Sequence, residues 1–273
     1  MAYLLSGRRG VSLTLGAGLA TLGASPAFAI ADRAMREARW KALDALLFGK
    51  TAPRDGAGIL TLDAPFRAQD AALVPMGLTV EPAAAPSVLM LVIDLNPSPV
   101  AAKVVYGPAG DPHLFRTRVR VNDYTWVHGV AETPDGIFMV RKYVRAAGGC
   151  SAPSVGDPAT ASRDIGQMKL RLARAPLANG AREATLLIRH PNNNGMQMDQ
   201  LTHYIIPPRF ITTIAVHHGG EQVFAMETGI SLAEDPAITF AFRPRPGAAL
   251  EAVVHDTSGA VFRKRFPITL PAS

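Results

Sequence analysis

The sequence predicts an all-β protein: two immunoglobulin-like β-sandwich domains in tandem, preceded by a signal peptide and a short N-terminal helix. From Gly58 onward the chain consists of short runs rich in Val, Ile, Leu and aromatic residues, each closed by Pro, Gly, Asn or Asp. This pattern is typical of antiparallel strands in sandwiches. The stretch RTRVRVND, residues 116–123, alternates strictly and therefore predicts a strand with one buried and one wet face. With 273 residues and 48% hydrophobic content, the chain can bury two cores.

Residues 1–29 have the three parts of an export signal. Arg8 and Arg9 precede an apolar run over residues 11–22, and small residues ending in Ala-Phe-Ala at 27–29 form a cleavage site. The arginine pair predicts the twin-arginine route and a periplasmic location. The alternatives are an ordinary secretory signal and a retained membrane anchor.

The remaining chain divides into four parts. Residues 30–48 show the spacing of an amphipathic helix, and they open a first sandwich domain at 30–150. Residues 151–164 are small, polar and broken by prolines, which predicts a linker. Residues 165–273 form the second sandwich domain. Each domain contains seven strand-like runs, and Pro134-Asp135-Gly136 is a hairpin turn signal in the first.

Most enzymatic and metal-binding classes find no support. The chain contains no G-x-S-x-G motif, no phosphate-binding loop and no dinucleotide-binding motif. The adjacent His217 and His218 would point to opposite faces of a strand, while His190, His203 and His255 are scattered. We therefore expect no catalytic residues, no metal and no cofactor. The charged residues are of both signs, and their net charge of +6 gives no evidence for a nucleic-acid partner.

The only cysteine, Cys150, stands in an unusual setting. It follows Gly148 and Gly149 and precedes Ser151, at the start of the predicted linker. In an oxidising compartment an unpaired cysteine bonds to another molecule or is a reactive thiol. Because glycine lacks a Cβ, the stretch predicts a thin, flexible, solvent-exposed arm that presents the thiol. Nearby cations that could favour the thiolate are Arg141, Lys142 and Arg145. The alternative is a linker residue without a role.

A second unusual stretch is RHPNNNGMQMDQLTHYIIPPRF, residues 189–210. Its three asparagines and Gly195 predict a loop that tolerates left-handed backbone geometry. Met196 and Met198 suggest an adaptable binding surface, because thioether side chains fit varied partners. The alternative is a long loop whose methionines pack against the fold.

These stretches carry a family resemblance. DLNPSP at 94–99, RTRVRVND and DGIFMVRKYVRAAGGC at 135–150 resemble the Y subunit of the sulfur-oxidation carrier SoxYZ. LIRHPNNNG at 187–195, PPRFITTIAVHHGGEQVF at 207–224 and TGISLAEDPAITFAF at 228–242 resemble its Z subunit. Over residues 58–271 the chain is similar to a fused SoxYZ-like carrier of the kind associated with periplasmic quinoprotein alcohol dehydrogenases.

The resemblance implies that Cys150 is the covalent attachment site for a sulfur-containing intermediate, with Gly148 and Gly149 as the flexible arm. It implies periplasmic sulfur-oxidation or quinoprotein dehydrogenase proteins as partners, no enzymatic activity, and no membrane contact after signal cleavage. Two features depart from the family pattern: Ser151 and Ala152 replace its last two glycines, and the arm is tethered on both sides. The alternative function is a non-covalent binding or assembly module for a quinoprotein dehydrogenase, with Cys150 incidental. A third is that the chain is itself a hydrolase or dehydrogenase.

Overall fold

The computed structural model describes residues 26–153 and 163–268, with the side chains of residues 26–32 left undescribed. Arg8, Arg9 and most of the predicted linker lie outside these residues. Helix α1 runs from Pro26 to Phe48 and spans the boundary between two units of the chain, residues 1–35 and 36–273. Among the described residues, no helix is long and apolar enough to cross a membrane.

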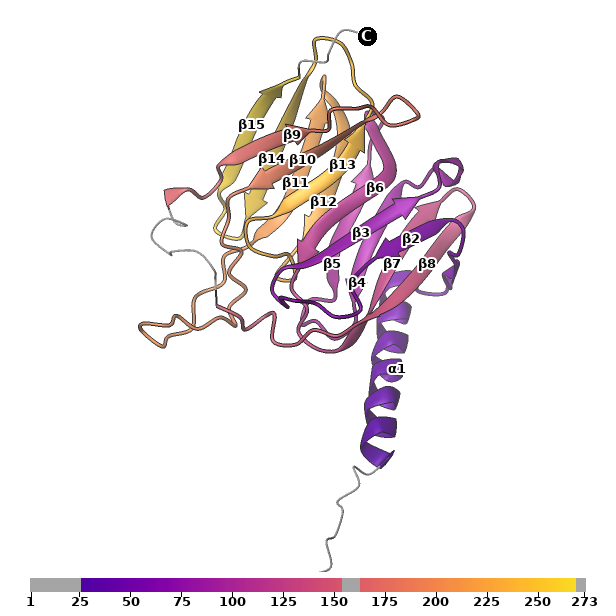
Figure 1. Ribbon diagram of the computed structural model, residues 1–273, viewed down its shortest axis with the longest axis vertical. Coiled ribbons are helices and arrows are strands. Elements are labelled where there is room, and N and C mark those ends of the chain that lie inside the picture. Colours follow the sequence, from indigo (N-terminus) through magenta and orange to yellow (C-terminus); the bar gives the residue numbers. More distant parts are fainter. Residues whose placement is uncertain (1–25, 154–162, 269–273) are drawn as a thin grey trace, which may run out of the picture. The chain divides into compact units, whose positions relative to one another are not determined.

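The second unit is built from two β-sheets (Figure 1). The larger has nine strands in the order β1 (Arg54–Asp55), β8 (Gly136–Val144), β7 (Thr125–Thr133), β4 (Val88–Ile93), β5 (Val100–Tyr106), β12 (Glu221–Thr228), β11 (Ile211–His218), β14 (Ala249–Asp256) and β15 (Val261–Pro267). The smaller has six strands in the order β2 (Leu60–Asp63), β3 (Val74–Val80), β6 (Gly110–Val119), β13 (Ala237–Phe242), β10 (Arg182–Ile188) and β9 (Met168–Leu172). A short 3-10 helix, η1, covers Pro82–Ala84.

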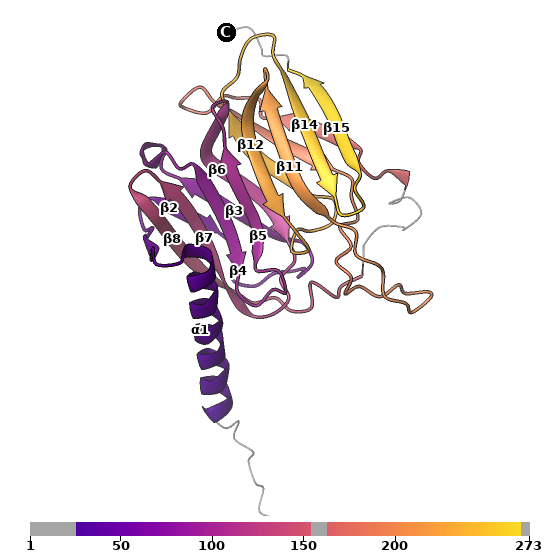
Figure 2. The ribbon, with the colours of Figure 1, turned by 180° about the vertical axis from the view of Figure 1, so that it is seen from behind.

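Both sheets run without interruption from the first half of the chain into the second. In the larger sheet β12 pairs antiparallel with β5, and Met226 lies opposite Val104. In the smaller sheet β13 pairs antiparallel with β6, and Phe240 lies opposite Phe115. The sandwich architecture predicted from the strand pattern is confirmed, and the two halves meet edge to edge within shared sheets (Figure 2).

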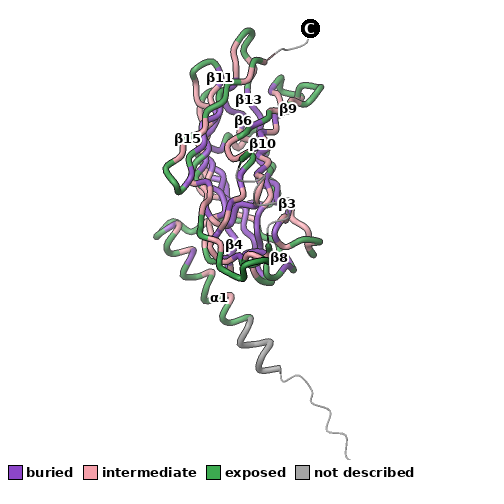
Figure 3. Tube along the Cα trace, turned by 90° about the vertical axis from the view of Figure 1, so that its left-hand side faces the viewer, coloured by how far each residue is buried: buried purple, intermediate pink, exposed green. Residues whose placement is uncertain are grey.

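One apolar core lies between the two sheets (Figure 3). It contains buried side chains from the first half, such as Leu78 and Phe115, and from the second half, such as Ile214 and Phe240. The strand faces that point inward are therefore apolar in both halves. Because one cluster spans the junction, the hydrophobic effect holds the halves together as well as folding each of them.

The last turns of α1 pack on the larger sheet. Trp40 stacks on His128 of β7 with ring centroids 3.6 Å apart, and Arg39 donates from Nε to the Asp94 carbonyl at 3.3 Å. Phe48 lies in a small apolar cluster with residues of β4 and β7. The helix predicted at 30–48 is thus confirmed and begins four residues earlier, at Pro26.

Every strand-like run of the sequence is a strand, and the Pro134-Asp135-Gly136 turn joins β7 to β8. The two-residue strand β1 lies ahead of Gly58, where the strand-like runs of the sequence begin. It pairs in parallel with β8 through Arg54 and Asp55, where no apolar alternation marks it.

Candidate functional site: the cysteine turn

Residues 148–152, which we call the cysteine turn, form a hydrogen-bonded turn rather than an extended arm. The amides of Ser151 and Ala152 both donate to the Gly148 carbonyl, at 3.2 and 3.0 Å. The amides of Gly148 and Gly149 donate to the carbonyls of Asn122 and Val121, just beyond β6, at 3.0 and 3.1 Å. The turn is therefore docked against the end of β6 at both of its glycines.

Both glycines have a steric role in this docking. Gly148 has a φ of +76°, a left-handed conformation that side chains disfavour. A Cβ on Gly149 would lie 2.0 Å from the Ala71 carbonyl oxygen and 2.6 Å from that of Val121. Both atoms belong to the backbone and cannot move aside cheaply. In this conformation Gly149 permits close packing of the turn, whereas flexibility was the expected reason for it.

The Cys150 thiol is buried, with 0% of its surface exposed. The predicted exposure of the thiol is therefore wrong for this conformation, because the glycines let the backbone sink between neighbouring segments. Burial raises the pKa of Cys150, and the positive charge of Arg120 opposes that shift. The role of Cys150 as an attachment site is a separate matter from its exposure and stays a prediction.

Side chains from the second half of the chain hold the cysteine turn. Asn194 Nδ2 donates to the Cys150 carbonyl at 2.7 Å, and Gln197 Nε2 donates to the Ala152 carbonyl at 3.3 Å. Gln197 Oε1 in turn accepts from the Asn194 amide at 3.2 Å. The second half thus closes over the cysteine that ends the first.

Arg120 approaches the same turn from the first half. Its side chain is 1% exposed, and Nη1 donates to the Gly149 carbonyl at 3.3 Å. Burial lowers the pKa of Arg120, while the charges of Glu234, Cys150 and Asp70 oppose that shift. The guanidinium remains the charged group that acts on the thiol from within the described residues.

Asn96 fixes the backbone from which Arg120 extends. Its Nδ2 donates to the Arg120 carbonyl at 2.7 Å and to Ser231 Oγ at 2.9 Å, and its Oδ1 accepts from the Asn122 amide at 2.9 Å. Because Ser231 belongs to the second half, this buried amide ties both halves to the segment beside the cysteine turn.

Two of the cations expected near the thiol are engaged elsewhere. Arg145 lies over the ring of Phe66 at 4.8 Å, and Arg141 lies over the ring of Trp126 at 4.6 Å. Arg120 takes the place expected for them. Arg120 lies just past the end of β6. The alternation of RTRVRVND predicts that its side chain faces solvent, but in the structure it is buried.

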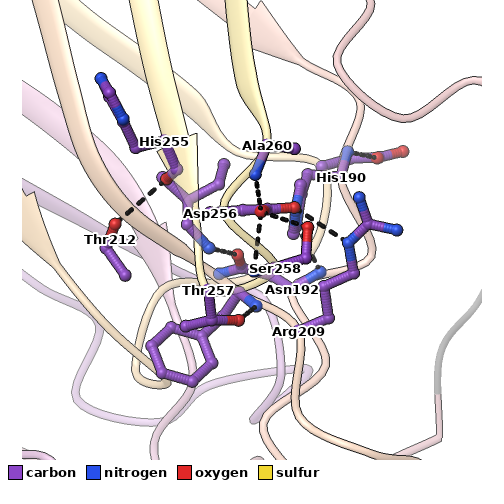
Figure 4. Close-up of polar contacts among 12 residues, drawn as sticks. His190, Asn192, Arg209, Thr212, His255, Asp256, Thr257, Ser258 and Ala260 are labelled. Carbon is purple, nitrogen blue, oxygen red and sulfur yellow. Dashed lines mark hydrogen bonds and ion pairs between the residues drawn. The ribbon is translucent and has the colours of Figure 1, made fainter.

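A second polar cluster surrounds Asp256 at the end of β14 (Figure 4). Oδ1 accepts from Ser258 Oγ at 2.6 Å and from the Ala260 amide at 3.1 Å. Oδ2 accepts from Arg209 Nε at 2.9 Å and faces His190 Nε2 at 3.4 Å. Burial disfavours the carboxylate, but the hydrogen bonds from Ser258, Arg209 and His190 outweigh it and hold the pKa of Asp256 well below its usual range.

His190 in this cluster is a neutral hydrogen-bonding group. The Asn192 amide donates to Nδ1 at 3.0 Å, so Nδ1 carries a lone pair and Nε2 carries the proton that faces Asp256. Burial is the main cause of its lowered pKa. Ser258 bonds to Asp256 and not to the imidazole, which differs from the order of a nucleophilic serine triad. The cluster is therefore a structural clamp.

The other histidines do not gather. His218 is buried and His217 is partly exposed on the neighbouring position of β11, as expected for alternating strand positions. Within residues 26–153 and 163–268, no group of three or more His, Cys, Asp or Glu side chains is placed to hold a metal ion.

The asparagine-rich stretch has two distinct parts. Its asparagines turn inward: Asn192, at a φ of +47°, is buried, and Asn194 holds the cysteine turn. The predicted left-handed geometry is confirmed at Asn192 and at Gly195. Beyond them a loop carries exposed large apolar side chains: Met198, Leu201, Tyr204 and Ile205. Leu201 is 91% exposed.

The site residues that sequence reasoning missed are Arg120, Asn194 and Gln197. Arg120 looked like one more outward position of an alternating strand, and the amides looked like loop polarity. One signal in the sequence could have identified Asn194: residues 192–197 contain four amide side chains. Such side chains, when buried, need specific hydrogen-bond partners.

Comparisons with known proteins match two separate parts of the chain to two family models. A family model described as "Sulfur oxidation protein SoxY" matches residues 45–150, and one described as "Sulphur oxidation protein SoxZ" matches residues 170–267. A search of curated proteins found no match.

Two solved structures are also similar to parts of the chain. The sulfur carrier protein SoxY from Chlorobium limicola f thiosulfatophilum is 18% identical with a TM-score of 0.37, over 43% of this chain and 99% of that one. A beta-glycosidase from Bacteroides vulgatus is 7% identical with a TM-score of 0.24, over 77% of this chain and 24% of that one. At these scores neither structure adds to the assignment, which rests on the two family models. The chain is a fused SoxYZ-like protein, with a SoxY domain followed by a SoxZ domain in one polypeptide.

Proposed function

We propose that this protein is a periplasmic carrier that holds a sulfur-containing intermediate covalently on Cys150 and presents it to partner proteins. One observation carries the proposal: the SoxY match ends at residue 150, the only cysteine of the chain, and the SoxZ match follows it. Its partners would be sulfur-oxidation proteins or a quinoprotein dehydrogenase system, as the family resemblance implies.

In this proposal the structure represents the closed state of the carrier. Opening the cysteine turn breaks five hydrogen bonds, made by the amides of Gly148 and Gly149 and by the side chains of Arg120, Asn194 and Gln197. Each is worth a net of about 1 kcal/mol, so opening costs roughly 5 kcal/mol. Local openings of this size occur within folded proteins, and a partner that binds the open turn would favour it.

The surroundings of the thiol suit a carrier of a sulfur group better than an enzyme that turns over substrate. The charged group acting on Cys150 from the described residues is Arg120, and a guanidinium does not accept a proton. Cys150 could take up and give back a sulfur group when partners supply the acid and base. This supports a carrier rather than an enzyme.

The alternative function, a non-covalent assembly module, is favoured by the exposed apolar loop around Leu201 and Tyr204, which are 91% and 78% exposed. Exposed clusters of this kind are often interaction sites. In that case the loop would bind a partner and Cys150 would be incidental.

The test compares wild type, Cys150→Ala and Cys150→Ser, each purified from the native periplasm and weighed intact. We expect wild type to carry additional mass that a reductant removes, and both variants to lack it and to fail in the physiological process. Because a buried serine hydroxyl costs about 1–3 kcal/mol without a partner, Cys150→Ala controls for stability. Variants that fold and support wild-type function would overturn the carrier proposal and favour the assembly module.

A further inference from the structure

The guanidinium of Arg120 has one open edge. Nη1 donates to Gly149, but among the described residues Nε and Nη2 have no hydrogen-bond partner. These two nitrogens form the side of the guanidinium that directs two parallel N–H bonds outward, the arrangement that binds two oxygens of one anion. Since only 1% of Arg120 is exposed, bulk water does not occupy this edge.

A buried cation with two unused donors is unfavourable unless an anion accepts from them. Asp70 and Glu234 lie near enough for their charges to favour the guanidinium. Neither of them bonds to Nε or Nη2. The open edge therefore has the composition of an anion site that this conformation leaves without its acceptor.

The position of that edge relates it to the cysteine. Arg120 donates a hydrogen bond to the carbonyl of Gly149, the residue directly before Cys150, and its charge acts on the thiol. We propose that the open edge of Arg120 binds the terminal oxygens of an oxyanion adduct on Cys150, such as a sulfonate or thiosulfonate, when the cysteine turn is closed. This inference rests on the proposed carrier function and assigns a residue and a state to it.

The chemistry distinguishes this adduct from others. A sulfonate group offers two oxygens to two parallel donors, while a methyl disulfide offers no charge and no oxygen. The added atoms require a local shift of the turn within the closed state. The turn has space beside Gly148, because a Cβ on that residue would have Ser151 Oγ as its nearest neighbour, at 3.8 Å.

Two reagents load Cys150 with matched adducts. With tetrathionate, the thiolate attacks a central sulfur, the central S–S bond breaks, and thiosulfate leaves with the electron pair, giving the anionic Cys–S–S–SO₃⁻. With methyl methanethiosulfonate, the thiolate forms a methyl disulfide and methanesulfinate leaves, giving a neutral adduct. Brief exposure to mild urea followed by dilution gives both reagents access to the thiol.

The experiment measures how fast dithiothreitol releases each adduct from full-length wild type, Arg120→Gln and Arg120→Lys. The measured quantity is the release rate of the thiosulfonate divided by that of the methyl disulfide. We expect this ratio to be about tenfold lower in wild type than in Arg120→Gln. Arg120→Lys keeps the charge but loses the paired donors, so its ratio should fall between the two. Losing the hydrogen bond to Gly149 loosens the turn and speeds release of both adducts alike, so this effect cancels in the ratio.

An unchanged ratio in Arg120→Gln would overturn the inference and leave Arg120 a structural residue. If neither variant folds, wild type alone decides: the thiosulfonate form should unfold at a higher temperature than the methyl disulfide form, and the reverse order would refute an anion site. Because loading is chemical, this result is independent of whether protein from the periplasm carries an adduct, which tests the proposed function.

Discussion

Two buried polar clusters, one around Asp256 and one around Arg120, differ in how completely their hydrogen bonds are satisfied. Asp256 has acceptor contacts with Ser258, the Ala260 amide, Arg209 and His190. Arg120 uses Nη1 and leaves Nε and Nη2 without partners among the described residues. Both are buried charges in the same fold.

The difference separates a structural role from a functional one. A buried charge that is fully hydrogen-bonded stabilises the arrangement of the segments that supply its partners. A buried charge with open donors is costly, and a fold retains it where a ligand or a second state supplies the missing acceptor. On this criterion the Asp256 cluster joins segments of the SoxZ domain, while Arg120 serves the cysteine turn.

The largest expected effect is on stability, from Asp256→Asn. Replacing the carboxylate leaves Arg209 and His190 without their anion, so the free energy of unfolding should fall by about 3 kcal/mol at pH 7. Because the folded-state pKa of Asp256 is lowered, its stabilisation is present above the unfolded pKa of about 3.9 and is lost as the pH falls below that value. Urea denaturation at pH 7 and pH 3 measures both quantities.

The gap between wild type and Asp256→Asn should therefore narrow in acid. A gap that widens at pH 3, or equal stability at pH 7, would show that the Asp256 cluster is not the structural clamp that the comparison assigns. Release of a Cys150 adduct should be unchanged in this variant relative to wild type, since among the described residues no hydrogen bond joins Asp256 to the cysteine turn.

The next largest effect is expected from Gly149→Ala. Its Cβ would lie 2.0 Å from the Ala71 carbonyl oxygen, so the closed turn cannot form and the thiol should become exposed. Alkylation of Cys150 by iodoacetamide at pH 7.5 should accelerate about 100-fold or more, corresponding to about 3 kcal/mol at 1.4 kcal/mol per tenfold.

Gly148→Ala is the matched control for this variant. It has room for a Cβ but must hold a left-handed φ of +76°, at a cost of about 1–2 kcal/mol, so alkylation should rise by roughly tenfold. Equal rates for wild type and Gly149→Ala would show that close packing of the turn is not what buries the thiol.

The smallest effect should come from Asn194→Ala. It removes the 2.7 Å hydrogen bond to the Cys150 carbonyl and leaves that buried acceptor unpaired, at a cost of about 1 kcal/mol. Alkylation should rise by roughly fivefold. Asn193→Ala, in a neighbouring residue that contributes its backbone to a bridge with Arg209, should stay close to wild type. Equal alkylation rates for the two variants would show that the hydrogen bond from Asn194 of the SoxZ domain does not hold the turn closed.

Much of the fold was predictable because strand periodicity is local. The alternation over Arg116–Val119 and the Asp135-Gly136 turn each depend on a few neighbouring residues, and both were confirmed. The two-residue strand β1 was missed because Arg54 and Asp55 carry no apolar alternation. The edge-to-edge joining of the halves depends on β5 meeting β12, more than a hundred residues apart.

The sequence by itself determined the sandwich architecture, the chain's only thiol and its place directly after Gly148 and Gly149, because composition and short-range pattern decide these. Tertiary structure alone decided that the thiol is buried, that Gly149 is required for close packing, and that Arg120 rather than Arg141 or Arg145 faces the cysteine turn. The physical reason is that solvent exposure and charge proximity depend on what packs over a segment. Here that cover is Asn194 and Gln197, which lie more than forty residues farther along the chain.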